Sequence, residues 1–454
     1  MSSILTKKYR GFLAKEFLNA FANTSQYVYA FIGRPQNWVD AANGSVSDTN
    51  PPVPVNDVQH QTFENWRDML GIKRIPEANT YLVVPRRNWA TNTAYIQYDD
   101  TDADLFSKAF YVLDTTSAPL KVYKCLWNNA NAASTIAPST IGTNVDPQTT
   151  GDGYVWQYMY TIGTDLFTFL TSAWMPVLAN STVQSNANTY AGRLPIAVPL
   201  VITNGGAGYN VAVTTVDTLI GDGSGATIVN TGVTITAGAV TKVLLSTGGL
   251  GYSNVQTINI YQAGATTAVL RAIIPPYPNH GYDPVMELGT AAVMATTQFE
   301  FSESGGLTVT NNYRRVGVIV NPLLANGNAA NANFYKQTTD CIVSSNTGVF
   351  APDDVIFNET NAANTTAIVV DVQPNGNAVP VLRLTYVNDK GQTAPFSPGD
   401  VLMCNATGVE YTIGVINSPA LTFFTGDILY CDQRVPITRA NDQVEEIKLV
   451  FQLG

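Results

Sequence analysis

Hydrophobic positions near the start of the chain recur at helical spacing. Four apolar side chains follow one another at four-residue intervals: Tyr9, Leu13, Phe17 and Phe21. Residues four apart lie on the same face of an α-helix, because each turn takes 3.6 residues. The pattern therefore predicts one short amphipathic helix over residues 7–22.

Runs of β-branched and aromatic residues predict that strands dominate the rest of the chain. The clearest runs are YVYAFI (27–32), YLVVP (81–85), LKVYKCLW (120–127) and YVWQYMYTI (154–162). The last of them alternates with a two-residue period, which is the pattern of a half-buried strand. A second helix is expected over residues 62–70, where apolar side chains lie three and four positions apart.

The composition changes near Ser185, where the chain becomes rich in Gly, Thr and Val and carries a near-repeat. One copy, VITNGGAGYN, starts at Val201 and the other, LLSTGGLGYS, starts at Leu244, and each is followed by a GAT triplet. Each copy is expected to form a strand, a turn in which glycines allow positive φ, and a further strand. Residues 185–285 are therefore predicted to be an inserted domain in which the two copies stack.

A second block with its own strand pattern is expected over residues 340–425. Its alternating runs are divided by turn residues, which is the pattern of a small barrel or sandwich. The two blocks leave three stretches for the core, which are residues 1–184, 286–339 and 426–454. The core is thus predicted to be discontinuous in sequence.

The end of the chain predicts a strand with one apolar face. Ile447, Leu449 and Phe451 are separated by single residues, so their side chains project to the same side. We expect residues 443–451 to pair inside the core with its first and third segments.

The composition shows that the chain has few charged residues for its surface. Hydrophobic residues make up 45% and charged residues 13% of the 454 positions, so Asn, Thr, Ser, Gln and Gly must supply most of the polar surface. The formal net charge of −10 disfavours binding to nucleic acid, which needs clustered positive charge. Charged residues interrupt the N-terminal region, and no apolar run reaches the ~18 residues of a membrane span. A soluble protein without a membrane or nucleic-acid partner is expected.

The four cysteines, at positions 125, 341, 404 and 431, are far apart and lack the spacing of zinc ligands. We expect each to be a buried thiol in a reducing cytoplasm, with a disulfide as the remaining alternative.

Catalysis by histidine is disfavoured because only His60 and His280 are present and neither lies in a motif of known chemistry. His60 stands in a polar stretch and His280 in a Pro-Gly turn, so both are expected to be ordinary surface or turn residues. Paired carboxylates for glycoside hydrolysis are not ruled out by the sequence, but no particular pair is indicated.

Two motifs resemble ligand-binding loops but lack residues or neighbouring elements that such loops need. The carboxylates of Asp99, Asp100, Asp102 and Asp104 resemble the start of a calcium loop, but Leu105 stands where that loop needs glycine. A solvated acidic loop is expected instead. The Gly-rich stretches at 221–225 and 248–251 are followed by β-like sequence and not by a helix, so hairpin turns are expected and no cofactor.

Several segments resemble a known family in the same order along the chain. They are YVYAFIGRPQNW (27–38), VPRRNWA (84–90), LKVYKCL (120–126), GDGYVWQYMYTI (151–162), RRVGVIVNPL (314–323), GDILYCDQRVPI (426–437) and DQVEEIKLVF (442–451). The family is the baseplate wedge subunit encoded by gene eight of the T-even contractile-tailed phages. The resemblance covers the core and leaves both inserted blocks unexplained.

The resemblance implies a virion protein of the tail baseplate that is made in the host cytoplasm. It implies a multilayer β-sandwich, in three layers with helix-bearing loops, and a homodimer bound beside the products of genes six, seven and ten. It implies a part in baseplate assembly, host attachment and DNA injection, and no catalytic residue.

Six residues in the resembling segments are candidate interface positions, because Arg, Trp and Tyr often anchor interfaces. They are Arg86, Arg87, Trp89, Tyr154, Trp156 and Arg434. Core packing of the aromatic residues and internal pairing of the arginines are the alternatives for these positions. Two other functions stay open: a fibre-attachment or glycan-binding adhesin, indicated by the Gly-rich repeat, and a cell-wall hydrolase.

Overall fold

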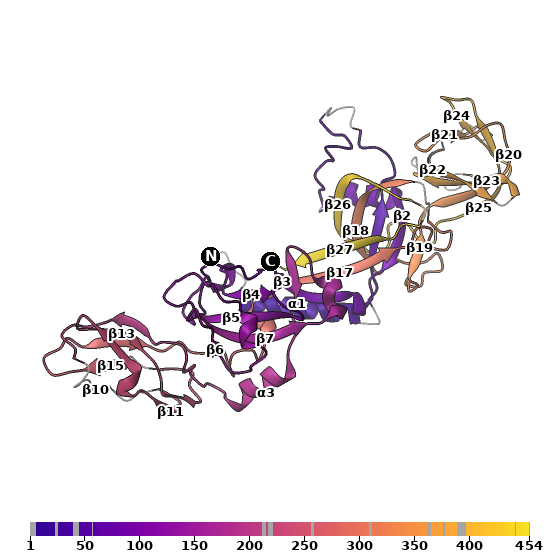
Figure 1. Cartoon of the computed structure of the whole chain (residues 1–454). Coiled ribbons are helices and arrows are strands. Elements are labelled where there is room, and N and C mark those ends of the chain that lie inside the picture. The colour runs from indigo at the N-terminus through magenta and orange to yellow at the C-terminus, as the bar shows by residue number, and fades with distance from the viewer. Residues whose placement is uncertain are drawn as a thin grey trace. The chain divides into compact units, whose positions relative to one another are not determined.

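The computed structural model shows a mainly β chain that divides into two compact units (Figure 1). The first unit contains Met1–Glu16, Tyr81–Met294 and Val450–Gly454, and the second contains Phe17–Thr80 and Ala295–Leu449. The structure describes residues 6–22, 26–39, 45–56, 58–210, 215–216, 221–255, 258–307, 311–360, 365–375, 377–387, 396–440 and 442–453. Each unit is assembled from segments that are distant in sequence.

The predicted first helix is present as α1 (Lys7–Ala22), but its packing differs from the prediction. Tyr9 in the predicted apolar stripe is 47% exposed, whereas Gly11 is buried. A Cβ atom at Gly11 would lie 2.9 Å from the Sδ atom of Met286 in the short helix α4 (Pro284–Glu287). Close approach of the backbone, and not the aromatic stripe, therefore positions this end of α1.

An antiparallel sheet of order β4-β5-β7-β6 lies at the centre of the first unit. Its strands are β4 (Tyr111–Asp114), β5 (Leu120–Trp127), β7 (Val155–Ile162) and β6 (Gln148–Thr149). The predicted strand β7 is present, but the half-buried position expected from its alternating pattern is wrong. Every residue of this strand except Thr161 is buried. Aromatic clusters cover both of its faces.

A second sheet has the order β27-β17-β3-β8. Its strands are β27 (Glu445–Gln452), β17 (Ala292–Phe299), β3 (Thr80–Pro85) and β8 (Trp174–Pro176). The C-terminal strand was predicted correctly, but its predicted partners are wrong, since its neighbour β17 belongs to the second stretch of the core, residues 286–339.

The Gly-rich block of the first unit forms sheets of its own. They are a sheet of order β10-β15-β16-β9, made of β10 (Thr215–Val216), β15 (Ile258–Tyr261), β16 (Ala268–Arg271) and β9 (Val201–Asn204), and two strand pairs, β11 (Ser224–Thr227) with β14 (Thr247–Leu250) and β12 (Val233–Thr236) with β13 (Ala239–Val243). One apolar cluster joins them. The helix α3 (Ser181–Thr189) leads into the block and lies before its first strand, and the Asn180 side chain caps the N-terminus of this helix.

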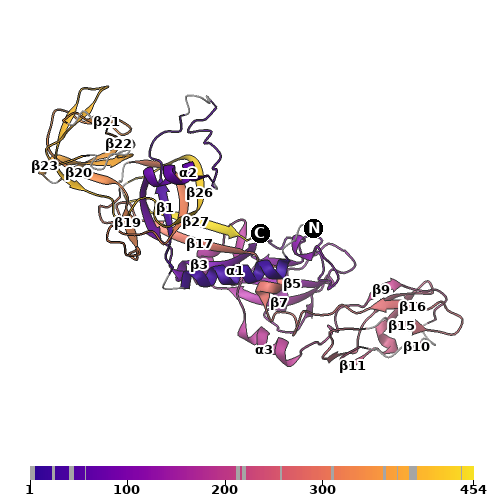
Figure 2. The ribbon, with the colours of Figure 1, turned by 180° about the vertical axis from the view of Figure 1, so that it is seen from behind.

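The second unit contains a five-stranded antiparallel sheet of order β19-β2-β1-β18-β26, seen from behind in Figure 2. Its strands are β19 (Phe334–Lys336), β2 (Met69–Arg74), β1 (Val28–Gly33), β18 (Asn312–Val320) and β26 (Asp427–Thr438). The predicted second helix is α2 (Gln59–Arg67), which ends earlier than expected. Met69 and Leu70 begin β2 instead, because pairing with β1 overrides their helical spacing.

A closed barrel of order β20-β23-β22-β21-β24-β25 also belongs to the second unit. Its strands are β20 (Thr339–Asn346), β23 (Asn377–Thr385), β22 (Thr366–Asn375), β21 (Val355–Asn358), β24 (Val401–Cys404) and β25 (Glu410–Asn417). The barrel is the first of the two forms that the sequence left open, and its inward side chains make one apolar core.

Short 3-10 turns connect several strands, at Glu77–Asn79, Leu105–Ser107, Pro138–Ile141, Thr164–Phe169 and Asn230–Gly232. All four cysteines are free and buried, as predicted.

Candidate functional site

Three of the candidate interface residues follow β3 and are held by contacts inside the first unit. Arg86 donates hydrogen bonds to the Asn88 side chain and to the Thr171 carbonyl, each 2.8 Å long. The guanidinium of Arg87 lies over the Tyr111 ring, 5.1 Å from its centroid. Trp89 donates from Nε1 to the Ser134 hydroxyl at 3.1 Å. These three side chains are only partly buried, so part of each remains at the surface.

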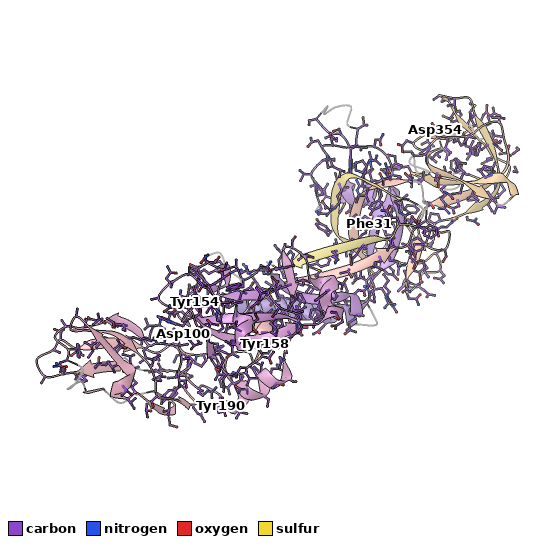
Figure 3. The ribbon with its side chains drawn as sticks, viewed as in Figure 1. Phe31, Asp100, Tyr154, Tyr158, Tyr190 and Asp354 are labelled. Atoms are coloured by element: carbon purple, nitrogen blue, oxygen red, sulfur yellow. The ribbon has the colours of Figure 1, made fainter. Side chains whose placement is uncertain are left out.

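The other two aromatic candidates lie in the core of the first unit. Tyr154, labelled in Figure 3, and Trp156 are fully buried and stack with their ring centroids 5.4 Å apart. Tyr95 packs edge-on against both rings, and its backbone amide donates to the Tyr154 hydroxyl. Such buried rings are not available to a partner while the unit is folded; they hold β7 in place.

Arg434 is the most exposed of the candidates and lies on β26, the last strand of its sheet. Its guanidinium pairs with Asp432 at 2.7 Å while 54% of the side chain is exposed. Its backbone carbonyl accepts a hydrogen bond from Nε1 of Trp38 at 2.8 Å. The amide of Cys431 on the same edge donates to the Asn56 side chain at 2.6 Å. The side chains of Trp38 and Asn56 thus form hydrogen bonds with backbone groups of β26 that a strand added at this edge would need.

An exposed aromatic surface adjoins this strand in the second unit. Phe63 of α2 and Phe424 meet edge to face at 4.9 Å, and Phe424 is 52% exposed. Phe423 packs against Phe424 with 5.9 Å between the ring centroids and is 37% exposed. We call Phe63, Phe423 and Phe424 the aromatic surface. Single exposed apolar residues are ordinary, but a group of this kind is typical of a protein interface.

The sequence prediction for His280 is wrong with respect to its exposure. The residue lies in a turn, as expected, but its side chain is 3% exposed and packs edge-on against the Tyr98 ring at 4.9 Å. Burial, together with the nearby ammonium of Lys124, lowers the pKa of His280 well below 6.5, so its imidazole is neutral at pH 7. His60 is exposed in the first turn of α2, as predicted.

A buried ion pair beside His280 was not predicted. Lys124 of β5 is fully buried and pairs with Glu287 of α4. The other oxygen of Glu287 accepts a hydrogen bond from the backbone amide of Gly281 at 2.7 Å. Burial lowers the pKa of Lys124, whereas the charge of Glu287 opposes that shift. Because pairing and hydrogen bonds satisfy both charges, this cluster fixes the turn at 280–283 to the central sheet.

The acidic loop is tied to cations of the protein. Arg271 of β16 binds Asp99 at 2.6 Å and Asp100 at 2.8 Å, and Lys108 binds Asp102 at 2.6 Å. The loop is therefore partly neutralised and not simply solvated, which corrects the prediction. In the described parts of the chain, His, Cys, Asp and Glu residues do not form a group of three that could hold a metal ion.

The second unit has an ionic cluster where two resembling segments meet through the pairing of β1 with β18. Arg314 binds both oxygens of Asp48, at 2.8 and 2.7 Å, and thereby holds the pKa of this carboxyl below its usual value. Arg315 pairs with the buried Asp68 at 2.5 Å. The guanidiniums of Arg34 and Arg315 both lie over the Trp38 rings. The sequence shows these residues, but not that they converge.

None of the helices in the described parts of the chain is long and apolar enough to span a membrane.

Comparison with known proteins shows a distant similarity. The chain is similar to the baseplate wedge protein gp8 of Enterobacteria phage T4, with 24% identity over 194 residues. The match covers 36% of this chain and 57% of that protein, so it spans little more than half of the relative. No protein-family model matches the chain. The resemblance predicted from the sequence segments is confirmed as a distant similarity.

Proposed function

We propose that this chain is a structural subunit of a phage tail baseplate, of the wedge type. The observation that carries the proposal is the similarity to baseplate wedge protein gp8. It is supported by the arrangement of the resembling segments. Those at 27–38, 314–323 and 426–437 supply β1, β18 and β26, which are neighbours in one sheet. Those at 120–126 and 151–162 supply β5 and β7, which are neighbours in another.

The proposed organisation is a core of residues 1–184, 286–339 and 426–454 that carries two inserted domains. The strands of 185–285 pair among themselves, and so do the six strands of the barrel within 339–417. This separation supports treating both blocks as additions to a wedge core. A three-layer sandwich remains our proposal for that core.

The subunit is proposed to act as a homodimer next to other wedge proteins, of the kinds encoded by genes six, seven and ten. The aromatic surface supplies apolar side chains for such a contact, and Arg434 lies on β26, the strand that begins shortly after Phe424. Trp38 and Asn56 occupy the edge of β26, so contact through side chains is favoured over strand addition. Arg86, Arg87 and Trp89 are candidates for a contact of the first unit.

The proposed role is mechanical and not enzymatic, with the protein located in the virion. Two buried ion pairs support a structural task for these charges. Lys124 pairs with Glu287, and Arg315 pairs with Asp68.

The test is to label purified virions with an antibody against this chain and to image them by negative stain. We expect the label at the distal end of the tail, and particles made without the chain should lack a complete baseplate. Label found only on fibres would favour the adhesin, and lysis of host peptidoglycan by the pure chain in a zymogram would favour the hydrolase.

A further inference from the structure

A cavity of about 400 Å³ lies inside the first unit, between the Gly-rich block and the central sheet. Its wall includes Gln157 of β7, Asn186 of α3, Thr247 of β14 and the turn residues Asn279 and His280. Ligand pockets in proteins commonly have volumes of about 300–1,000 Å³, so the cavity has room for a compact ligand of one or two rings. Segments far apart in sequence build it, and the Gly-rich block alone would lack the part of the wall formed by residues 145–148 and Gln157.

An ion pair within the wall neutralises its charged side chains. Arg193 pairs with Asp146, and the Asn186 amide lies 3.4 Å from the same carboxylate. The guanidinium of Arg193 also lies over the ring of Tyr190, labelled in Figure 3, at 3.9 Å from its centroid. A phosphate or carboxylate ligand needs a cation that is free to bind it. Here the guanidinium is already engaged by an internal carboxylate, so a neutral ligand fits better.

Side-chain amides dominate the polar part of the wall. Gln148, Gln157, Asn186 and Asn279 all contribute to it. Their NH2 groups donate to oxygens of the chain itself, so the amide oxygens are the groups that can accept hydrogen bonds from a ligand. Between these groups lie the apolar side chains of the 194–197 segment.

We propose that this cavity binds a neutral saccharide. A sugar ring presents neighbouring hydroxyls that donate and accept at once, together with apolar C–H faces. The amide oxygens can accept hydrogen bonds from the hydroxyls, and the 194–197 segment matches the C–H faces. The site goes beyond the proposed wedge function, and labelling of the tail tests that function separately.

The experiment uses the full chain, because both the Gly-rich block and the central sheet form the wall. Binding is measured by calorimetry against neutral di- to tetrasaccharides chosen from a glycan array. Ile196 lines the cavity and is 52% exposed, so Ile196→Trp should fill the opening with little effect on folding. The matched control is Val229→Trp, at a position in the same block that is 44% exposed and away from the cavity wall.

We expect Ile196→Trp to weaken saccharide binding at least tenfold and Val229→Trp to leave it unchanged. Asn186→Ala should weaken saccharide binding by a smaller factor than Ile196→Trp does. Its melting temperature should stay close to that of the parent chain. Polysaccharide from the host surface, tested beside free oligosaccharides, identifies the source of the ligand. The proposal is overturned if no neutral sugar binds at millimolar concentration, if only acidic glycans bind, or if Ile196→Trp binds as well as the parent.

Discussion

The hydroxyl of Tyr209 accepts a hydrogen bond from the backbone amide of Ala268, 2.7 Å away. Tyr252 is related in the same way to Ala226, with 3.3 Å between the two atoms. Each tyrosine ends one copy of the Gly-rich repeat, and each alanine lies in or just after the GAT triplet that follows the other copy. The two copies therefore pack reciprocally, each fixing a strand of the other.

The second glycine of each copy permits this packing. Gly206 has a φ of +63°, and a Cβ atom placed on it would lie 2.2 Å from the Thr266 carbonyl oxygen. Gly249 has a φ of +56°, and its Cβ would lie 2.3 Å from the Ser224 carbonyl oxygen. A side chain at either position would be disfavoured for two reasons, which are the left-handed backbone and the close approach to a neighbouring segment.

Gly206→Ala should destabilise the Gly-rich block more than Gly264→Ala does. Gly264 has a φ of +85° but no atom within 4 Å of its virtual Cβ, so it serves as a control for backbone strain alone. That strain costs about 1–2 kcal/mol, and Gly206→Ala must add the displacement of a strand. Urea unfolding and the hydrogen-exchange protection of the Ala268 amide measure the difference. Equal losses for both variants would show that the close approach is not limiting.

Arg315→Ala should destabilise the second unit by about 3–5 kcal/mol, because it leaves the buried Asp68 carboxylate without its cation. Arg434→Ala is the control, since it removes an arginine of the next strand whose pair is largely exposed. Such a pair contributes less than about 1 kcal/mol. Chemical denaturation compares the two variants. A similar effect of both would mean that Arg315 and Asp68 are not a buried pair.

Stability should fall as the pH is lowered through 6.5, because of His280. Its pKa in the folded chain lies well below the ordinary value of 6.5, so the unfolded chain binds a proton that the folded chain rejects. The free energy of unfolding then decreases by up to about 1.4 kcal/mol per pH unit within this window. Melting temperatures at pH 7.5, 6.5 and 5.5 should show the slope. His280→Gln should lose it, whereas His60→Gln at an exposed position should retain it.

The sequence predicted most elements of the fold, because strand propensity and local spacing are properties of short segments. The helix α1 and the strands β3, β5 and β7 fall within a residue or so of the expected ranges. The end of α2 was missed because Met69 pairs with Gly33 of β1, and the sequence does not show such a distant partner. Burial of β7 on both faces was missed for a similar reason, since other segments cover its second face.

The candidate site was less accessible to sequence reasoning. Lys124 and Glu287 are 163 residues apart, and Arg315 and Asp68 are 247 apart, so neither pair forms a recognisable motif. The available signal was the presence of charged residues inside runs otherwise typical of buried strands, as with Lys124 in LKVYKCLW. A charge there needs a buried partner, but which partner follows only from the topology. The aromatic surface gave no signal, since the sequence alone does not distinguish an exposed phenylalanine from one in the core.

Phe424→Ser should weaken self-association of the chain without loss of stability. The side chain is 52% exposed, so its replacement removes little buried area from the folded unit but takes an aromatic ring from the aromatic surface. Val349→Ser is the control, because this exposed position lies apart from the aromatic surface, between β20 and β21 of the barrel. Sedimentation velocity at micromolar concentration should show a dimer for the parent and the control, and a shift to monomer for Phe424→Ser. A parent chain that is monomeric would contradict the proposed homodimer.

The C-terminal strand should be required for folding although it lies at the edge of its sheet. Ile447 and Leu449 of β27 are buried, and each contributes roughly 1.5–3 kcal/mol before the entropy of ordering the strand is subtracted. At the start of β27, Glu445 pairs with the buried Arg439 at 3.0 Å.

A chain that ends after Asp442 loses these contacts and leaves Arg439 without its carboxylate. It should be insoluble or melt well below the full chain. Leu449→Asp should act in the same direction, because it buries a charge without a partner. Lys448→Ala changes the neighbouring side chain, whose pair with Glu446 is partly exposed, and should shift the melting temperature very little. Because β27 follows the barrel in sequence, such a global effect means that the fold is completed only when the last residues are present. If the truncated chain melts like the full one, β27 is an accessory strand and the core closes without it.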